Sequence, residues 1–169
     1  MQRILVIGSP GSGKSMLATE IARRTGLPLI HLDKEQWRSG WVETPKDEWR
    51  DRVAELAARE RWVIDGNYGG TLEPRLERAD LVIDLEFPAW LCVWRILKRV
   101  ATSRGTVRPD MAEGCPEHFN FEFLLYTATF PLTARKRADA KLARYRGQRI
   151  HLRSPAAVRR FLANFDPRG

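Results

Sequence analysis

The feature that most constrains this chain is a glycine-rich stretch near its N-terminus. It follows the apolar run Ile4-Leu5-Val6-Ile7, which predicts a buried parallel strand, and it precedes a segment of helical periodicity from Met16 to Arg24. The stretch matches the pattern G-x-x-x-x-G-K-[ST], and it lies between a predicted strand and a predicted helix, which is where this pattern binds phosphates. The residues of the stretch are Gly8, Ser9, Pro10, Gly11, Ser12, Gly13, Lys14 and Ser15. A chain with this stretch is expected to bind phosphate groups.

Each part of the stretch has a physical role in holding a phosphate chain. Backbone N–H groups must approach the anion closely, so residues without bulky side chains form the turn. The helix that follows, beginning around Met16, adds the positive end of its dipole. We predict that Lys14 contacts the β and γ phosphates and that the Ser15 hydroxyl takes one position on Mg²⁺. The expected cofactors are therefore ATP and Mg²⁺.

Length and cysteine usage limit the class of protein. A chain of 169 residues predicts a single domain over residues 1–169 that buries its apolar surface without crosslinks. No secretion signal is visible and no apolar run is long enough to cross a bilayer, so we expect a cytoplasmic protein without membrane contact. Cys92 and Cys115 lie far apart and outside any C-x-x-C pattern, which predicts idle thiols rather than a disulfide or a zinc site.

Acidic residues mark the ends of two predicted strands. Residues 27–32 predict a strand that stops at Asp33, and residues 61–65 predict one that ends at Asp65. Open parallel sheets bind ligands at the carboxyl ends of their strands. Asp33 is therefore expected to orient or deprotonate an acceptor hydroxyl, or to hold water on the metal; alternatively it begins a turn or caps the next helix. Asp65 is the preferred carboxylate beside the metal, and Asp84, inside a fourth predicted strand over residues 81–85, is its competitor.

Arginines follow in the second half of the chain. Arg95 and Arg99 are four residues apart on a predicted helix and share one face, where they are expected to clamp phosphate groups. The loop 103–116 carries Arg104 and Arg108 between glycines and a proline, which is typical of a mobile lid over a transferring phosphate. Alternatively, Arg95 and Arg99 are ordinary solvent-exposed charges of a helix, and the loop 103–116 is an ordinary surface loop.

Aromatic residues gather in three places. Trp37 and Trp41 lie in a predicted loop over residues 37–45, where they either stack on an acceptor ring or pack at the domain edge. The helix with the arginine pair is expected to bury the stripe Trp90, Leu91, Val93, Trp94 and Leu97. A third group is expected to form the core of a helical layer rather than a platform for base stacking; its members are Phe119, Phe121, Phe123, Tyr126 and Phe130. After a fifth strand over residues 148–152, Arg153 is expected beside a purine base.

With these residues in view, the sequence resembles the P-loop kinases of the adenylate and shikimate kinase type. It is still more similar to the small bacterial DNA topology modulation (FlaR-like) proteins. The resemblance rests on Ile30-His31-Leu32-Asp33, Gly40-Trp41-Val42-Glu43-Thr44-Pro45, Trp62-Val63-Ile64-Asp65-Gly66-Asn67-Tyr68 and the segment from Arg108 to Pro116. It implies a three-layer α/β/α domain with a five-stranded parallel sheet in the order 2-3-1-4-5 and a short lid.

The resemblance also assigns roles to residues. Asp65-Gly66 matches the Asp-Gly near the metal of adenylate-kinase-like enzymes, and Asp33 matches the acid that ends the second strand of shikimate-kinase-like enzymes. Arg95 and Arg99 match the Arg-x-x-x-Arg before the lid, and Arg135 and Arg137 are the nearest fit to a second arginine pair after it. The chain departs from the pattern at Asn67-Tyr68, which replaces the Phe-Pro-Arg that holds a nucleoside monophosphate, so Arg75 is only a loose candidate for that arginine.

These observations predict an ATP- and Mg²⁺-dependent kinase of a small acceptor, which is either a nucleotide or a hydroxylated metabolite. The rival hypothesis comes from the charge distribution. Residues 1–94 carry 13 basic and 15 acidic side chains, whereas residues 95–169 carry 16 basic and 6 acidic ones. A basic surface suits polyanions, so the alternative is an ATP-binding regulatory protein that contacts DNA and has little kinase activity. No DNA-reading motif is present in the sequence.

Overall fold

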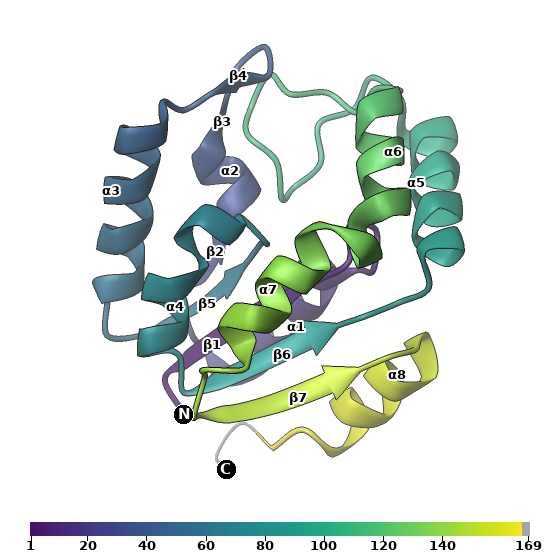
Figure 1. The fold of residues 1–169 in the computed structure, drawn as a ribbon. Coiled ribbons are helices and arrows are strands. Elements are labelled where there is room, and N and C mark those ends of the chain that lie inside the picture. Colours follow the sequence, from purple (N-terminus) through teal and green to yellow (C-terminus); the bar gives the residue numbers. More distant parts are fainter. Residues whose placement is uncertain (167–169) are drawn as a thin grey trace.

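The computed structural model describes residues 1–166 and has three layers, with helices on both faces of a central sheet (Figure 1). The strands are β1 (Arg3–Gly8), β2 (Leu29–His31), β3 (Trp37–Arg38), β4 (Val42–Glu43), β5 (Trp62–Asp65), β6 (Leu81–Leu85) and β7 (Gln148–Leu152). The α-helices are α1 (Lys14–Thr25), α2 (Leu32–Gln36), α3 (Lys46–Ala58), α4 (Leu72–Arg78), α5 (Ala89–Ser103), α6 (Phe121–Thr129), α7 (Ala134–Leu142) and α8 (Pro155–Asn164). Two 3₁₀ helices, η1 (Gly69–Thr71) and η2 (Phe130–Leu132), precede α4 and α7.

Five strands form the main sheet in the order β2-β5-β1-β6-β7, and all of its neighbours pair in parallel. The expected order 2-3-1-4-5 is confirmed, counted over these five strands. The register places His31 of β2 beside Asp65 of β5, and Asp65 beside Val6 of β1. Gly8, the first residue of the phosphate-binding stretch, lies just beyond on β1. The carboxyl ends of three adjacent strands therefore meet at the start of that stretch.

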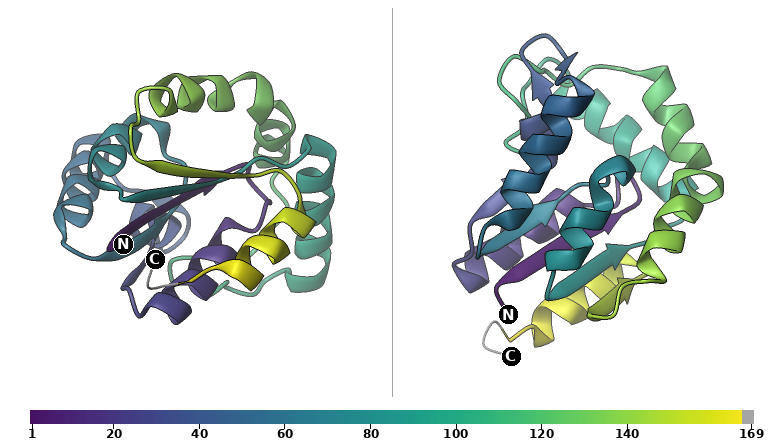
Figure 2. Two further views of the ribbon diagram at one scale, coloured as in Figure 1. Left: turned by 90° about the horizontal axis from the view of Figure 1, so that it is seen from below. Right: turned by 60° about the vertical axis from the view of Figure 1, so that its left-hand side comes forward.

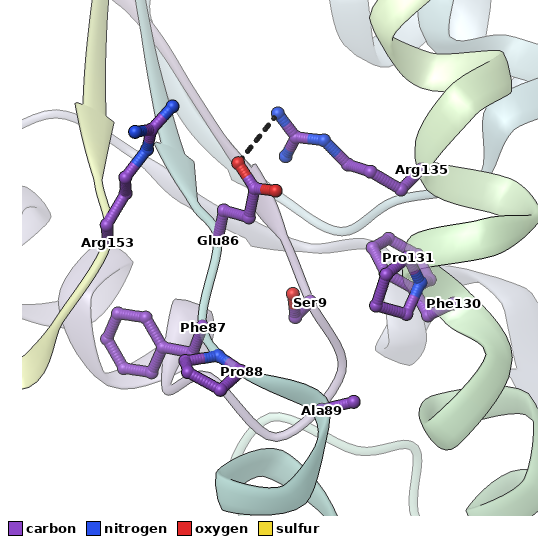
Figure 3. Close-up of a pocket in the computed structure, with 9 residues that line it drawn as sticks. All are labelled: Ser9, Glu86, Phe87, Pro88, Ala89, Phe130, Pro131, Arg135 and Arg153. Atoms are coloured by element: carbon purple, nitrogen blue, oxygen red, sulfur yellow. Dashed lines mark ion pairs between the residues drawn. The ribbon is translucent and has the colours of Figure 1, made fainter.

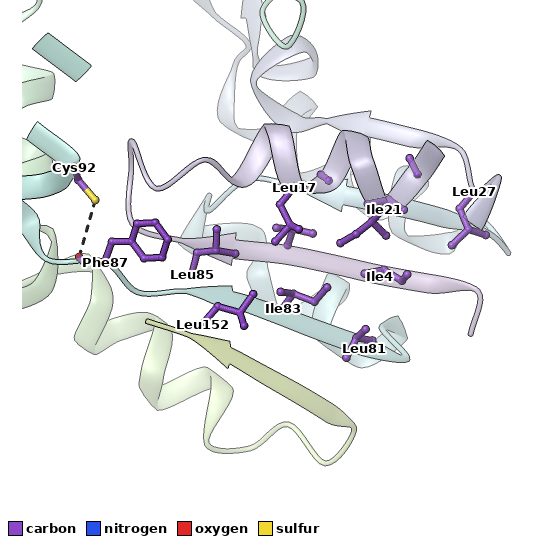
Figure 4. Packing of buried hydrophobic residues seen from close by; sticks show 14 residues of the cluster. Ile4, Leu17, Ile21, Leu27, Leu81, Ile83, Leu85, Phe87, Cys92 and Leu152 are labelled. Carbon is purple, nitrogen blue, oxygen red and sulfur yellow. Dashed lines mark hydrogen bonds between the residues drawn. The ribbon is translucent and has the colours of Figure 1, made fainter. Parts of the chain in front are cut away.

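Apolar side chains of β1 alternate between two cores because successive residues of a strand point to opposite faces. Ile4 and Val6 belong to the cluster under α1 and α8, part of which is drawn in Figure 4. Leu5 and Ile7 belong to the cluster under α3, α4 and α7. Figure 2 shows these helices on opposite sides of the sheet. Burial on both faces explains why β1 is a continuous apolar run rather than an alternating one.

The segment after β2 differs from the expected strand over residues 27–32. The strand ends at His31, and Leu32 begins the short helix α2, which places Asp33 in the first turn of a helix. The expectation that Asp33 terminates a strand is wrong, and Asp33 does not cap the helix either, because His31 is the N-cap of α2. Residues 37–45 are not a plain loop, because β3 and β4 pair as an antiparallel hairpin.

The hairpin β3–β4 contacts the loop between α5 and α6, which reaches across the upper part of the molecule (Figure 1). The Gly40 N–H donates a hydrogen bond of 3.0 Å to the Gly114 carbonyl oxygen. The Cys115 thiol lies 3.2 Å from the carbonyl oxygen of Arg38. The expected lid over residues 103–116 therefore has a docking partner within its own chain. Ser103, the first of these residues, is the last residue of α5.

The aromatic residues of α5 and α6 are not core residues as expected. Trp90 and Trp94 are 71% and 54% exposed, whereas the buried positions of α5 are Cys92 and Ile96. In the third aromatic group only Phe130 is buried; Phe119, Phe121, Phe123 and Tyr126 are exposed. The side of α5 with Cys92 and Ile96 lies against the phosphate loop: a Cβ added to Gly11 would lie 2.7 Å from the Cys92 carbonyl oxygen, so only glycine fits at position 11.

Cys92 and Cys115 are free and buried. No helix within residues 1–166 combines the length and the apolar composition that crossing a membrane requires.

Candidate active site

The glycine-rich stretch forms a tight loop between β1 and α1. Gly8 has φ +136°, and a Cβ on it would lie 2.0 Å from the Leu85 carbonyl oxygen, so no other residue fits there. Gly13 caps α1 with φ +96° and has open space beside it. The N–H groups of Lys14, Ser15 and Met16 belong to the first turn of α1 and have no acceptor within the helix. The loop therefore has the backbone geometry of an anion-binding site.

The Lys14 ammonium lies across this loop and donates a hydrogen bond of 3.0 Å to the Ser9 carbonyl oxygen. Burial lowers the pKa of Lys14, while the charges of Asp33 and Asp65 act in the opposite direction. Arg95 approaches from α5, and its Nη1 donates a hydrogen bond of 3.1 Å to the Ser12 carbonyl oxygen. The expected phosphate loop, its lysine and one arginine of the pair on α5 are thus brought together.

Asp33 is held by a hydrogen bond of 2.6 Å from the Tyr68 hydroxyl to its Oδ1. Burial raises the pKa of Asp33, while the Tyr68 hydrogen bond and the nearby charges of Lys14 and Arg108 lower it. A partly desolvated carboxyl group with one fixed oxygen is suited to accept a proton or a hydrogen bond from a hydroxyl.

Asp65 lies at the end of β5, as expected, and His31 contacts it. Nδ1 of His31 is 2.5 Å from Oδ1 of Asp65. Burial disfavours the imidazolium form of His31, but the hydrogen bond and the charge of Asp65 outweigh burial and raise the pKa of His31. Asp65 is therefore a charged partner in the site as well as a candidate metal ligand.

The donor set fits a magnesium ion that is shared with a nucleotide. Ser15, which carries the hydroxyl, follows Lys14 in the first turn of α1. Asp65 uses only Oδ1 in its contact with His31, so its second carboxylate oxygen remains for a further contact. Mg²⁺ binds one or two protein oxygens and takes its other ligands from phosphates and water. No group of three or more His, Cys, Asp or Glu residues suited to a metal occurs within residues 1–166. Ser15 and Asp65 would hold Mg²⁺ only together with phosphate oxygens.

Asp84, the competing candidate for the metal, forms ion pairs with two arginines instead. It is fully buried, and Arg135 binds both of its oxygens at 2.8 and 2.9 Å. Arg149 binds it as well, at 2.6 Å. Neither Asp84 nor Arg135 is free for the metal or for phosphate, because each neutralises the other. Arg137, the second member of the expected pair after the lid, is exposed on α7.

The remaining arginines of the expected clamp differ in their surroundings. Arg99 binds Glu117 through Nη2 at 3.1 Å. Arg108 pairs with Glu117 at 2.9 Å and with Asp110 at 3.0 Å. Arg104 is exposed at the C-terminal end of α5, and residues 1–166 offer it no hydrogen-bond or ion-pair partner. Arg99 and Arg108 are thus neutralised by Glu117 and Asp110.

Arg75 has a structural role, so it is wrong as a candidate for binding a nucleoside monophosphate. Its side chain is completely buried in α4. The guanidinium donates hydrogen bonds to the carbonyl oxygens of Gly66, Asn67 and Tyr68 at 2.8, 2.7 and 3.0 Å, and Nε donates one to the Thr71 carbonyl. Arg75 therefore fixes the turn that carries Tyr68.

Arg153, at the end of β7, lines a cavity of about 350 Å³ (Figure 3). The cavity reaches Ser9 of the phosphate loop, and its walls include Phe87, Pro88 and Phe130. Glu86 and Arg135 form an ion pair of 3.5 Å across one side. Arg153 and Ser9 thus line the same cavity, and the expectation that Arg153 lies beside a purine base stays a prediction.

Sequence reasoning missed several residues of the site. Asn67 accepts a hydrogen bond of 3.0 Å from the Gly8 N–H and thereby ties the turn after β5 to the phosphate loop. Tyr68 and His31 bind the two aspartates described above. In the sequence His31 lies two residues before Asp33, and Tyr68 lies three residues after Asp65. This proximity was an available signal. Glu117 has no such signal, because it lies beyond the predicted lid and only the fold brings it to Arg99.

Comparisons with known proteins agree with this geometry. Residues 4–64 match the sequence family described as ATPase family associated with various cellular activities (AAA). This match contains the phosphate loop but covers less than half of the chain. No curated protein matches the sequence at a significant level.

Solved structures resemble nearly the whole chain. Shikimate kinase from Acinetobacter baumannii, in complex with shikimate, has a TM-score of 0.58 and 18% identity over 96% of this chain and 91% of that one. Shikimate kinase from Bacteroides thetaiotaomicron has a TM-score of 0.57 and 18% identity over 96% and 94%. A gluconokinase from Sinorhizobium meliloti has a TM-score of 0.53 and 20% identity over 96% of this chain and 94% of that one. These likenesses define the fold as the three-layer fold of the P-loop kinases.

Proposed function

We propose that this protein transfers the γ-phosphoryl group of ATP to a hydroxyl group of a small acceptor, with Mg²⁺ as cofactor. One observation carries the proposal: the turn Asn67-Tyr68 joins the phosphate loop to Asp33, because Asn67 accepts a hydrogen bond of 3.0 Å from the Gly8 N–H and Tyr68 donates one of 2.6 Å to Asp33. A loop that only binds nucleotide has no need of a second, partly desolvated carboxylate beside its lysine. A phosphotransferase does, because the attacking hydroxyl must be positioned next to the γ-phosphate.

The roles follow from the contacts. The backbone N–H groups of Gly13 and of the first turn of α1, Lys14 to Met16, bind the phosphates, and the Lys14 ammonium neutralises charge that develops on the transferring group. Ser15 and Asp65 would hold Mg²⁺, which when bound would neutralise charge on the phosphate oxygens. Asp33 accepts a hydrogen bond or a proton from the acceptor hydroxyl. Arg95 contacts phosphate from α5, and Arg153 lies beside the nucleotide base in the cavity that it shares with Ser9.

The resemblance to solved kinases supports the proposal at the level of the fold. Shikimate kinase and gluconokinase both phosphorylate small molecules, and both share this fold over almost the whole chain. Identity of 18–20% is too low to carry their acceptors over to this protein.

The experiment is transfer of phosphate from γ-labelled ATP with Mg²⁺ to a panel of nucleosides, nucleoside monophosphates and small hydroxylated metabolites. Lys14→Ala should lower turnover by about two orders of magnitude or more, because it removes a charge aimed at the transition state. Lys136→Ala, which removes an exposed lysine of α7, is the matched control and should retain parental turnover. Parental activity in Lys14→Ala would sink the assignment.

A second experiment distinguishes the kinase proposal from the rival hypothesis of a DNA-binding regulatory protein. ATP binding is measured with and without duplex DNA over a range of salt concentrations. Tight ATP binding without transfer to any acceptor, together with DNA binding that weakens steeply with salt, contradicts the kinase proposal. That result favours a regulatory protein that contacts DNA through its basic second half.

A further inference from the structure

A closed ring of contacts joins the phosphate loop, the hairpin β3–β4 and the lid. Asn67, in the turn after β5, accepts a hydrogen bond of 3.0 Å from the Gly8 N–H of the phosphate loop. The next residue, Tyr68, donates one of 2.6 Å to Asp33 of α2. Helix α2 continues directly into the hairpin. One half of the ring thus runs from the phosphate loop, past the candidate acceptor carboxylate, to the hairpin.

The other half of the ring runs through α5 and the loop 104–120 that joins α5 to α6, here called the lid loop. Arg95 of α5 donates a hydrogen bond of 3.1 Å to the Ser12 carbonyl oxygen of the phosphate loop. Further along α5, Arg99 binds Glu117 of the lid loop at 3.1 Å. Glu117 also pairs with Arg108 at 2.9 Å, and its side chain is only 8% exposed. Breaking such a largely buried ion pair is costly, so the lid loop stays attached to α5.

The hairpin closes the ring because it docks on the lid loop, which reaches across to it in Figure 1. The Gly40 N–H donates a hydrogen bond of 3.0 Å to the Gly114 carbonyl oxygen. The Cys115 thiol is buried at this junction, 3.2 Å from a carbonyl oxygen of the hairpin. The ring of Trp41 meets the ring of His118 edge-on, with a distance of 5.0 Å between their centroids.

The docked junction carries two local costs, and both fall on Trp41. Its φ of +62° is a left-handed conformation that strains a bulky residue. Its indole Nε1 is buried and has no hydrogen-bond partner within residues 1–166, which is unfavourable for a donor. Separation of the hairpin from the lid loop relieves both costs, because the backbone of Trp41 can relax and its N–H can reach water. The junction is therefore the part of the ring that opens most readily.

We propose that the junction between the hairpin and the lid loop is the gate of the candidate active site. The gate is closed while residues 38–41 are docked on residues 114–118, and it opens when they separate, which admits ATP and the acceptor. The ion pairs of Glu117 keep the lid loop on α5 in both states. This inference rests on the proposed function, because a gate has a role only at a site that takes up ligands.

Cys115 reports on the gate without any nucleotide. It is 1% exposed at the junction, whereas Cys92 is fully buried in the core cluster under α1. Opening of the gate exposes Cys115 alone, whereas global unfolding exposes both thiols. Labelling of each thiol by iodoacetamide is followed by mass spectrometry, and we expect Cys115 to react about tenfold faster than Cys92 or more. Equal labelling rates would mean that the junction opens only on global unfolding, and would overturn the inference.

Gly114→Ala should hold the gate open. A Cβ at this position would lie 2.1 Å from Oγ of Ser39 in the hairpin and 2.9 Å from its Cβ, so rotation of the hydroxyl does not relieve the clash. Gly105→Ala is the matched control, because Gly105 has a similar φ, +79° against +75°, but open space beside it. We expect Cys115 to react about tenfold faster in Gly114→Ala and within about twofold of the parent rate in Gly105→Ala. Equal rates in the two variants overturn the inference.

A second substitution tests whether the clash with the hairpin is the cause. Ser39→Gly in the Gly114→Ala background removes both side-chain atoms that the new methyl group meets. The double variant should return to the labelling rate of the parent protein, because the two positions interact directly. A double variant that reacts as fast as Gly114→Ala would overturn the role of the junction.

The kinetics of nucleotide binding test whether the junction controls entry. The association rate constant of a fluorescent ATP analogue with Mg²⁺ is measured by stopped flow. It should rise about threefold or more in Gly114→Ala and stay at the parent value in Gly105→Ala, because association is slow when it requires a conformational change. Faster labelling of Cys115 with unchanged association would overturn the gate. A parent protein that binds no ATP contradicts the proposed function, and the labelling rates then decide whether the junction opens.

Discussion

The Tyr68 hydroxyl donates a hydrogen bond of 2.6 Å to Oδ1 of Asp33, although the two residues are 35 positions apart in the chain. Tyr68 has φ +36°, a left-handed conformation that costs a bulky residue about 1–3 kcal/mol. Arg75 stabilises this conformation by binding the Tyr68 carbonyl oxygen. A buried arginine, a strained turn and a tyrosine thus fix one oxygen of the carboxylate that we place at the acceptor hydroxyl.

The first prediction is that Tyr68→Phe lowers kcat/KM by about tenfold to a hundredfold, because a general base loses the group that orients it. The change also shifts the pH profile. The Tyr68 hydrogen bond lowers the pKa of Asp33, so its removal raises that pKa further above the ordinary value. Asp33 must be ionised to accept a proton, and the acidic limb of the kcat/KM profile should therefore move to higher pH.

Tyr145→Phe is the matched control for this change. It also removes a phenolic hydroxyl that donates a hydrogen bond, here of 2.9 Å to the Ala79 carbonyl oxygen between α4 and β6. Its pH profile should coincide with that of the parent protein. A Tyr68→Phe profile that loses height without moving its acidic limb would contradict a direct action on Asp33.

The second prediction separates chemistry from nucleotide binding. Asp33→Asn keeps the shape of the side chain but cannot accept the proton, so transfer should be lost while the Kd for ATP stays within about twofold of the parent value. Lys14→Ala should weaken both ATP binding and phosphate transfer. Equilibrium ATP binding and single-turnover transfer are measured on the same preparations. Loss of ATP binding in Asp33→Asn would point to a structural role instead.

The main sheet and the phosphate loop could be predicted because each rests on a local pattern. Burial on both faces produces the uninterrupted apolar run of β1. The edge strand β7 is only partly buried, yet it has the predicted bounds, Gln148–Leu152. The conformations of Gly8 and Gly13 admit only glycine, which makes the loop visible in the sequence. The short helix after β2 was missed because Leu32 is fully buried and continues the apolar run of the strand.

The orientation of α5 could not be predicted from periodicity. Trp90, Trp94 and Leu97 are spaced as one helical stripe, but Cys92 and Ile96 form another with the same spacing. The stripe of Cys92 and Ile96 lies against Gly11 of the phosphate loop, and only the fold reveals that contact. The same holds for ion pairs. The sequence has 29 basic residues, and nothing local indicates that Arg135 meets Asp84 or that Arg99 meets Glu117.

The third prediction concerns Arg75, which acts on stability. Arg75→Met leaves the carbonyl groups of the turn after β5 without donors, so the free energy of unfolding should fall by about 3 kcal/mol. Arg78→Met in the same helix removes an exposed guanidinium with a single long contact of 3.4 Å and should cost about 0.5 kcal/mol or less. Denaturant unfolding of both variants measures the difference. Similar stability of the two would contradict the structural role of Arg75.

The last prediction distinguishes the two aspartates considered for the metal. Asp84→Asn leaves Arg135 and Arg149 without their buried counter-charge and should lower the free energy of unfolding by about 3–5 kcal/mol. Asp139→Asn, which removes a 46% exposed partner of the same Arg135, should cost about 1 kcal/mol or less. Asp65→Asn should instead raise the Mg²⁺ concentration required for half-maximal transfer, because it removes a ligand on the metal side. Stability is measured by denaturant unfolding and the metal requirement by Mg²⁺ titration of transfer. If Asp84→Asn raises the Mg²⁺ requirement and Asp65→Asn does not, the assignment of the two carboxylates is reversed.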